Sequence, residues 1–152
     1  MENKLFDLKD RYFLVTGASG LLGREHCEAI LSSNGNPIAL DINLLSLELL
    51  KKDLYKKYQK NVITFQSSVT NLKALLKVKS ELHKKNIYLS GLINNAALNP
   101  QVSQNGLSSL NRLEDYCLDS WDKELEVGLK GSFLVIRAFM DDLNSHEYSG
   151  SI

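Results

Sequence analysis

The segment that decides the fold is Tyr12-Phe13-Leu14-Val15-Thr16-Gly17-Ala18-Ser19-Gly20-Leu21-Leu22-Gly23, where a short apolar run enters a turn with three glycines. A short apolar run closed by a turn is typical of a buried β-strand. The residues after the turn have a helical pattern over 21–31, and the turn-forming run 32–37 ends it. The segment therefore predicts a strand, a glycine turn and a helix in immediate succession.

Each glycine of the turn has a separate predicted role. Gly17 permits the tight turn, Gly20 leaves the backbone open to a pyrophosphate, and Gly23 lets the helix pack closely on the strand. Free N–H groups at a helix start attract phosphate, and the helix dipole adds to the attraction. The alternative is a glycine-rich turn with a purely structural role. The strand and helix on either side favour a dinucleotide site.

Outward from this segment, strands and helices alternate along the chain. The patterns predict further strands at 38–40, 62–65 and 87–93 and helices at 44–58, 72–85 and 121–143, the last capped by Asp119-Ser120. A long polar loop is predicted over 94–118, and residues 150–152 read as the start of a fifth strand. Such alternation produces a doubly wound parallel sheet of the Rossmann type. We expect one α/β domain over residues 1–152, the N-terminal part of that fold and incomplete at its C-terminus.

Asp41 supports the dinucleotide interpretation independently, because it ends the second predicted strand, 18 residues after Gly23. A carboxylate there accepts hydrogen bonds from the adenosine ribose and repels a 2′-phosphate, so NAD is expected to bind better than NADP. The alternative is an ordinary N-cap for the helix that follows.

Composition excludes several classes of partner. Eighteen basic and eighteen acidic residues balance, so nothing favours nucleic acid or an anionic membrane surface. No apolar run reaches the roughly 20 residues that span a bilayer, and the N-terminus has no apolar signal core, so we expect a soluble cytoplasmic protein. Cys27 and Cys117 are expected to be reduced thiols packed as small apolar groups. Neither the cysteines nor the three histidines have metal-ligand spacing, and the histidines are expected to be structural.

Three features together resemble the short-chain dehydrogenases/reductases. Asn94-Asn95-Ala96-Ala97 is similar to the family's Asn-Asn-Ala-Gly motif, and Val-Gly-Leu-Lys-Gly-Ser-Phe at 127–133 to its Val-Asn-Leu-x-Gly-x-Phe helix segment. Trp121 stands where the family often has a Trp. The resemblance covers essentially the whole chain. Within the family, the Asn-Asn-Ala-Ala-Leu-Asn-Pro run at 94–100 and the predicted helix segment 20–30 most resemble oxidoreductases of flagellin modification and nonulosonic-acid pathways.

The resemblance implies an NAD(P)-dependent oxidoreductase and a set of cofactor-binding residues. Those carried over from the family are Gly17, Ser19, Leu22 and Gly23 at the phosphates, Asp41 and Ile42 at the adenosine, Ser68 and Val69 at the adenine, and Asn95, Ala96 and Ala97 beside the nicotinamide ribose. With Gly20, which the turn itself indicates, they form the predicted site. The full-length form is expected to be a homo-oligomer.

Several positions depart from the family pattern. The middle glycine at 20 matches the spacing of the extended, sugar-nucleotide branch, Ser68 replaces an Asp, Ala97 replaces a Gly, and Gly128 replaces the Asn of the proton-relay tetrad. The family's catalytic Ser and Tyr-x-x-x-Lys are missing, since no tyrosine has a lysine four residues later. We therefore predict no catalytic residue in this chain, which reads as a fragment or truncated product.

The function predicted for the full-length form is hydride transfer between NAD(H) and an alcohol or carbonyl carbon of a sugar or sugar nucleotide. Two alternatives stay open at this point. One is an extended-type epimerase or dehydratase, which the glycine spacing favours. The other is a non-catalytic dinucleotide sensor, for which missing catalytic residues would be natural.

Overall fold

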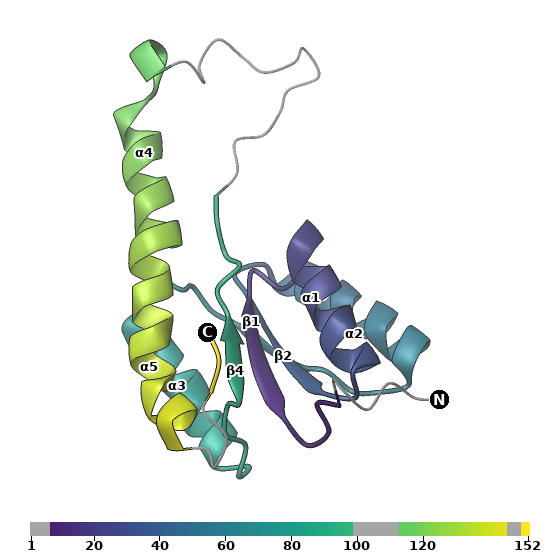
Figure 1. Cartoon of the computed structure of the whole chain (residues 1–152). Coiled ribbons are helices and arrows are strands. Elements are labelled where there is room, and N and C mark those ends of the chain that lie inside the picture. Colours follow the sequence, from purple (N-terminus) through teal and green to yellow (C-terminus); the bar gives the residue numbers. More distant parts are fainter. Residues whose placement is uncertain (1–6, 99–112, 146–149) are drawn as a thin grey trace.

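Parallel strands form the centre of the molecule (Figure 1), which we describe from a computed structural model over residues 7–98, 113–145 and 150–152. The strands of the sheet are β1 (Tyr12–Thr16), β2 (Asn36–Asp41), β3 (Ile63–Gln66) and β4 (Gly91–Ile93). They lie in the order β3-β2-β1-β4, and every pair is parallel. The strand order therefore reverses at β1, with β2 and β3 on one side of it and β4 on the other, as in a Rossmann-like sheet. The predicted α/β fold class is confirmed.

Helices cover both faces of this sheet, because side chains alternate in direction along each strand. Leu14, Ile38 and Leu40 face α3 (Leu72–His83) and α5 (Ser132–Ser145). On the other face, the core contains the β1 and β2 residues Val15 and Ala39 and the buried residues of α1 (Leu21–Ser32) and α2 (Leu44–Tyr58). Two apolar cores therefore hold the strands rigid between them and leave the carboxyl ends of the strands free for a site.

The fourth strand is shorter than predicted. Residues 87–93 were expected to be extended, but only Gly91–Ile93 pairs with β1. Ile87 donates its N–H to the Leu82 carbonyl at the end of α3, and Leu89 donates to the carboxylate of Asp142. Ile87 and Leu89 are buried while Tyr88 is exposed, and this first half of the run is held by helices and not by the sheet.

The last predicted helix begins earlier and is less regular than expected. It begins with α4 (Leu118–Leu125), passes through a π-helical turn, η4 (Glu126–Gly131), and continues as α5 (Figure 1). The predicted cap at Asp119-Ser120 is wrong, because Cys117 is the N-cap and its carbonyl accepts the Ser120 and Trp121 N–H groups. Asp119 lies in the first turn, where its negative charge suits the helix dipole. The predicted loop 94–118 contains a short 3₁₀ turn, η3 (Leu113–Asp115), and its residues 99–112 lie outside the described part.

The buried carboxylate of Asp142 links α5 to α3 and to the segment before β4. The Asp142 side chain on α5 is 1% exposed, accepts the Leu89 N–H at 3.1 Å and lies 2.9 Å from Nε2 of His83 on α3. The Lys79 ammonium group lies 3.8 Å from the same carboxylate. Burial of a carboxylate is costly without such partners, so this cluster fixes α5 against α3 and the approach to β4. The sequence predicted only a structural role for His83 and did not indicate this contact.

The predicted start of a fifth strand lies beside β4. Ser151 forms an isolated parallel bridge with Gly91, and its carbonyl accepts the Leu92 N–H at 2.9 Å. In Figure 1 the C-terminal residues run next to β4.

Among the helices of the described residues, none is both long and apolar enough to cross a membrane.

Candidate functional site

A pocket of about 580 Å³ lies at the carboxyl ends of the strands. Every predicted cofactor-binding residue except Ser19 and Gly23 lines it. The sheet brings together turns that are far apart in sequence, because the carboxyl ends of parallel strands meet at one edge. The pocket is lined by Gly17, Gly20, Leu21, Leu22, Leu40, Asp41, Ile42, Ser67, Ser68, Val69, Asn95, Ala96, Ala97, Leu98 and Val127.

Two of the three turn glycines are required by geometry. Gly17 has φ +61°, and a Cβ there would lie 2.9 Å from the Ala96 Cα. A Cβ at Gly23 would lie 2.1 Å from the Gly17 carbonyl oxygen and 2.7 Å from the Ala18 Cα. The predicted roles of Gly17 in the turn and Gly23 in close packing therefore agree with the structure. Gly20 has an ordinary extended backbone, so its predicted role depends on access to the site and not on conformation.

The N-terminus of α1 fits a phosphate group. Its N-cap is Gly20, which has no side chain to cap the first turn, and that turn holds no acidic residue. By contrast, α2 and α3 are capped by Asn43 and Asn71, whose side chains accept N–H groups of their own helices. Because no side chain of α1 itself caps its first turn, the first amides of α1 and its dipole are suited to a pyrophosphate.

Asp41 lies at the end of β2, next to the glycine turn. Its Oδ2 accepts the Ser19 N–H at 3.0 Å, and its Oδ1 accepts the Asn43 N–H at 3.0 Å. The alternative role as helix N-cap is wrong, because the cap of α2 is Asn43. An ionised carboxylate has about four acceptor positions, so Asp41 keeps capacity for ribose hydroxyls.

Thr16 and Asn95 join β1 to the loop after β4. The Asn95 side-chain amide donates to the carbonyls of Thr16 at 3.0 Å and Gly17 at 3.1 Å. The Thr16 hydroxyl donates to the Ile93 carbonyl and accepts the N–H groups of Asn95 and Ala96. Both amide hydrogens of Asn95 are thus used on the protein, so it shapes the pocket wall through the backbone.

The far end of the pocket lies after β3, where Ser67, Ser68 and Val69 line it. The Ser68 hydroxyl is 2.8 Å from that of Thr70 and accepts the Thr70 N–H, so it is held within its own loop. Val69 packs against η4, where a Cβ on Gly131 would lie 2.6 Å from its Cγ2. The same turn brings Val127 to the pocket. The π-helical turn therefore supplies one wall of the site, as such turns often do.

Sequence reasoning did not assign five of the lining residues. They are Leu21, Leu40, Ser67, Leu98 and Val127. Leu40 and Ser67 are direct neighbours of predicted residues, so the strand ends could have indicated them. The motif containing Val127 was noted, but a straight helix gives no reason to place that residue at the site.

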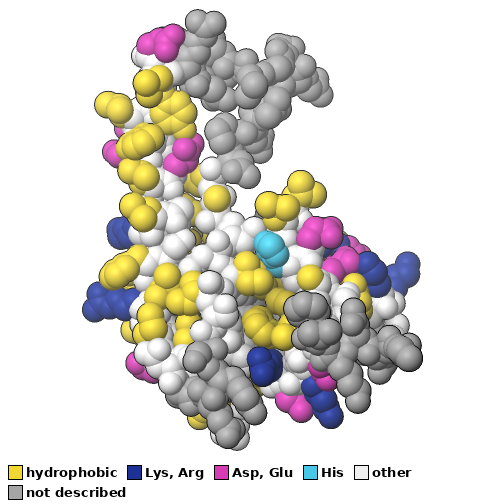
Figure 2. All heavy atoms as spheres, viewed as in Figure 1, with side chains coloured by type: hydrophobic (Ala, Val, Ile, Leu, Met, Phe, Trp, Pro, Cys, Tyr) yellow, Lys and Arg dark blue, Asp and Glu magenta, His cyan; other side chains and the backbone are white. Residues whose placement is uncertain are grey.

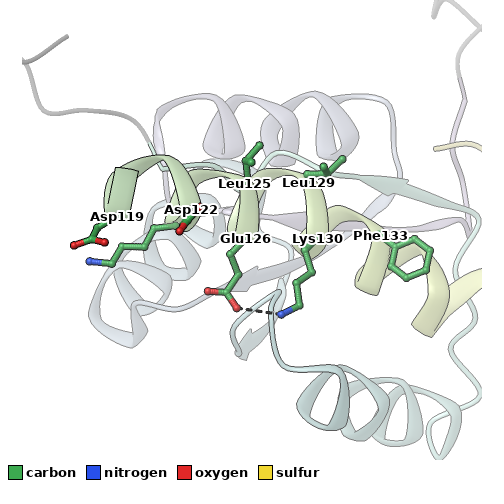
Figure 3. A pocket seen from close by; sticks show the side chains of 8 residues that line it. Asp119, Asp122, Leu125, Glu126, Leu129, Lys130 and Phe133 are labelled. Carbon is green, nitrogen blue, oxygen red and sulfur yellow. Dashed lines mark hydrogen bonds and ion pairs between the residues drawn. The ribbon is translucent and has the colours of Figure 1, made fainter. Parts of the chain in front are cut away.

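A second, shallower hollow lies along α4, η4 and α5 (Figure 3). Its volume is about 860 Å³, and its lining includes Leu125, Leu129 and Phe133 and the ion pair between Lys130 and Glu126 at 3.2 Å. All its lining residues come from one continuous stretch of helix. It lacks converging polar groups from other elements, so it is a surface feature and not a candidate active site.

The remaining reactive side chains indicate no second site. Burial raises the pKa of the Cys27 thiol to about 12, whereas hydrogen bonding, chiefly to the Ser120 backbone, lowers the pKa of Cys117. Both thiols are free, but Cys117 is exposed, so the expectation that both pack as apolar groups holds only for Cys27. Within the described ranges, no three His, Cys, Asp or Glu side chains gather as a metal site would require. His146 and Tyr148 lie outside those ranges.

Parallel topology, a glycine turn before a helix, and a carboxylate after β2 define a Rossmann-like α/β fold. The sequence profile described as short chain dehydrogenase matches residues 11–152. The chain therefore belongs to the short chain dehydrogenase family, as the motifs predicted.

Relatives agree with this assignment. "NAD-dependent glycerol dehydrogenase" of Listeria innocua is 28% identical over 133 residues, covering 88% of this chain and 47% of the relative. "Post-translational flagellin modification protein A" of Campylobacter coli is 27% identical over 89 residues, covering 59% of this chain and 35% of the relative. A short chain dehydrogenase from Shigella flexneri, complexed with NADP, has a TM-score of 0.82 at 19% identity, covering 96% of this chain and 59% of its own. The chain spans about half the length of the Listeria relative and about a third of the Campylobacter one.

Proposed function

We propose that this chain binds NAD(H) in the 580 Å³ pocket and is the dinucleotide-binding half of a hydride-transferring oxidoreductase. The observation that carries the proposal is the position of Asp41 beside an uncapped helix N-terminus in one pocket. The α1 amides are suited to the pyrophosphate, Asp41 to the adenosine ribose, and Ser68 with Val69 to the adenine. Ala96 and Ala97 allow close approach of the nicotinamide ribose.

Cofactor preference is the first testable consequence. A 2′-phosphate would bring negative charge next to the Asp41 carboxylate, so we expect NAD(H) to bind at least about tenfold more tightly than NADP(H). The fold does not decide this, since a neighbour of the same fold is recorded with NADP while the Listeria relative is NAD-dependent by name. Calorimetric titration of the protein with both cofactors measures the ratio. Equal affinity would contradict the ribose role of Asp41.

The proposed substrate is a sugar or sugar nucleotide, oxidised or reduced at a carbinol or carbonyl carbon. When bound, the nicotinamide ring accepts or donates the hydride. A relative named for glycerol, a polyhydroxylated compound, and another named for flagellin modification support this class. The match to the short chain dehydrogenase profile, the Asn94-Asn95-Ala96 segment and Trp121 favour a dehydrogenase over an epimerase or dehydratase of the extended branch.

The isolated chain is expected to be catalytically inactive. No tyrosine in the sequence has a lysine four residues later, so the chain does not supply the Tyr–Lys pair that moves the alcohol proton in this family. NAD reduction, followed at the absorbance of NADH, should stay at background with glycerol, sugars and sugar nucleotides. A control titration must show that the same preparation binds NAD. Steady turnover by purified protein would overturn the proposal that this chain binds the cofactor but lacks the catalytic residues. Binding without turnover also suits a dinucleotide sensor.

We further propose a cytoplasmic location and, for the full-length form, a homo-oligomer. Balanced charge supports the absence of nucleic-acid or membrane partners. Exposed apolar side chains on α4, η4 and α5 support self-association.

A further inference from the structure

Asp41 connects three separate segments of the site. Its carboxylate accepts the Ser19 N–H of the glycine turn and the Asn43 N–H of its own loop. Its main-chain carbonyl accepts the Ser67 N–H at 2.9 Å, in the loop after β3. The turns that surround the phosphate, ribose and base regions therefore meet at one residue.

The bond to Ser19 constrains the glycine turn at its middle. The turn is otherwise fixed at its edges, where Ala18 donates to the Leu40 carbonyl at 3.2 Å and Gly20 donates to the Gly17 carbonyl at 3.1 Å. Between those points the Ser19 N–H is directed at the carboxylate of a neighbouring strand, 22 residues away. A hydrogen bond to an ionised acceptor is stronger than one between neutral groups, so this contact adds a strong constraint at the middle of the turn.

We propose that Asp41 is a positioning residue for the phosphate-binding turn, in addition to its contact with ribose. The inference rests on the proposed function. The carboxylate holds Ser19, and with it the path from Gly17 to the start of α1, in the shape that accepts a pyrophosphate. Loss of the carboxylate therefore weakens binding even of a dinucleotide that has no ribose hydroxyl for Asp41 to contact.

Two substitutions separate the positioning role from the charge. Asp41→Ala removes both acceptors and the charge. Asp41→Asn removes the charge but keeps one side-chain oxygen, which can still accept the Ser19 N–H. The matched control is Asp53→Ala. It removes an exposed carboxylate on α2 that is paired with Arg24 of α1 and lies outside the pocket lining.

The decisive ligand is an NAD analogue whose adenosine ribose is 2′,3′-dideoxy, titrated by calorimetry against the wild type and the three variants. We expect Asp41→Ala to weaken binding of this analogue about tenfold or more, Asp41→Asn to weaken it less, and Asp53→Ala to leave it unchanged. For NADP, Asp41→Asn should narrow the gap to NAD, because the repelling charge is gone. An unchanged affinity of Asp41→Ala for the dideoxy analogue would overturn the positioning role.

A measurement without any ligand keeps the two proposals distinguishable. Amide hydrogen exchange at Ser19, measured by NMR, should be about tenfold faster in Asp41→Ala than in the wild type and nearly normal in Asp41→Asn. Exchange at the Leu14 amide in β1 reports whether the fold is intact. If Ser19 exchange is unchanged, the positioning role fails. If wild-type protein does not bind NAD at all, the proposed function fails, whatever the exchange result.

Discussion

Gly23→Ala is expected to destabilise the protein by about 1–3 kcal/mol and to weaken NAD binding on the order of a hundredfold. The added Cβ would lie 2.1 Å from the Gly17 carbonyl oxygen and 2.7 Å from the Ala18 Cα. Both are backbone atoms, so no side chain can rotate away, and α1 must move off the end of β1. That movement misaligns the first amides of α1, which in the proposed complex would each donate a hydrogen bond to the phosphates. Thermal melting and calorimetric titration with NAD measure the two effects.

Gly128→Ala is the matched control for that substitution. Gly128 also lies in a helical segment, but a Cβ there would meet no heavy atom within 4 Å. Alanine should leave NAD affinity unchanged and raise stability by up to about 1 kcal/mol, since glycine is the poorer helix former. If Gly23→Ala behaves like Gly128→Ala in both measurements, the close approach of α1 to the glycine turn is not required.

The second large effect concerns the apolar surface of the last helices. Leu129 is 69% exposed and Phe133 is 59% exposed, and Trp121 and Leu125 add to the same stretch. Figure 2 shows apolar side chains along this projecting segment. Leu125, Leu129, Phe133, Ile136 and Met140 recur at three-to-four spacing, which is more apolar surface than one side of a small sheet can cover. Val135 and Phe139 are fully buried, so the uncovered part lies N-terminal to them.

We expect the protein to self-associate at micromolar concentration through this surface, since burial contributes roughly 25 cal/mol per Å² and a standard interface buries about 800 Å² per partner. The double variant Leu129→Glu, Phe133→Glu should raise the dissociation constant at least about a hundredfold, because it places two charges in the contact. Leu49→Glu, an equally exposed leucine on α2, is the control and should leave association unchanged. Sedimentation velocity over a concentration series measures this. A wild type that stays monomeric at high concentration would contradict the expectation.

Local pattern was sufficient for the elements near the site. Four apolar residues before Thr16-Gly17 predict β1, and the leucine spacing of 44–58 predicts α2 with the bounds that the structure shows. Periodicity reports which residues must be buried, and it is a property of consecutive residues. For the same reason the ends of β4 and of the last helix were misjudged, because partners distant in the sequence decide where a buried run pairs with the sheet.

The positions of Gly17, Gly20 and Asp41 around one pocket also follow from the sequence, because parallel strands must place their carboxyl ends together. Tertiary structure alone decided what each group does there. Asp41 accepts the Ser19 N–H, the Asn95 amide donates to the Thr16 and Gly17 carbonyls, and η4 brings Val127 to the far wall. It also decided that Asp142 is buried beside His83. Hydrogen bonds between residues 22 to 79 positions apart depend on how the layers pack, and no local pattern of residue types encodes that packing.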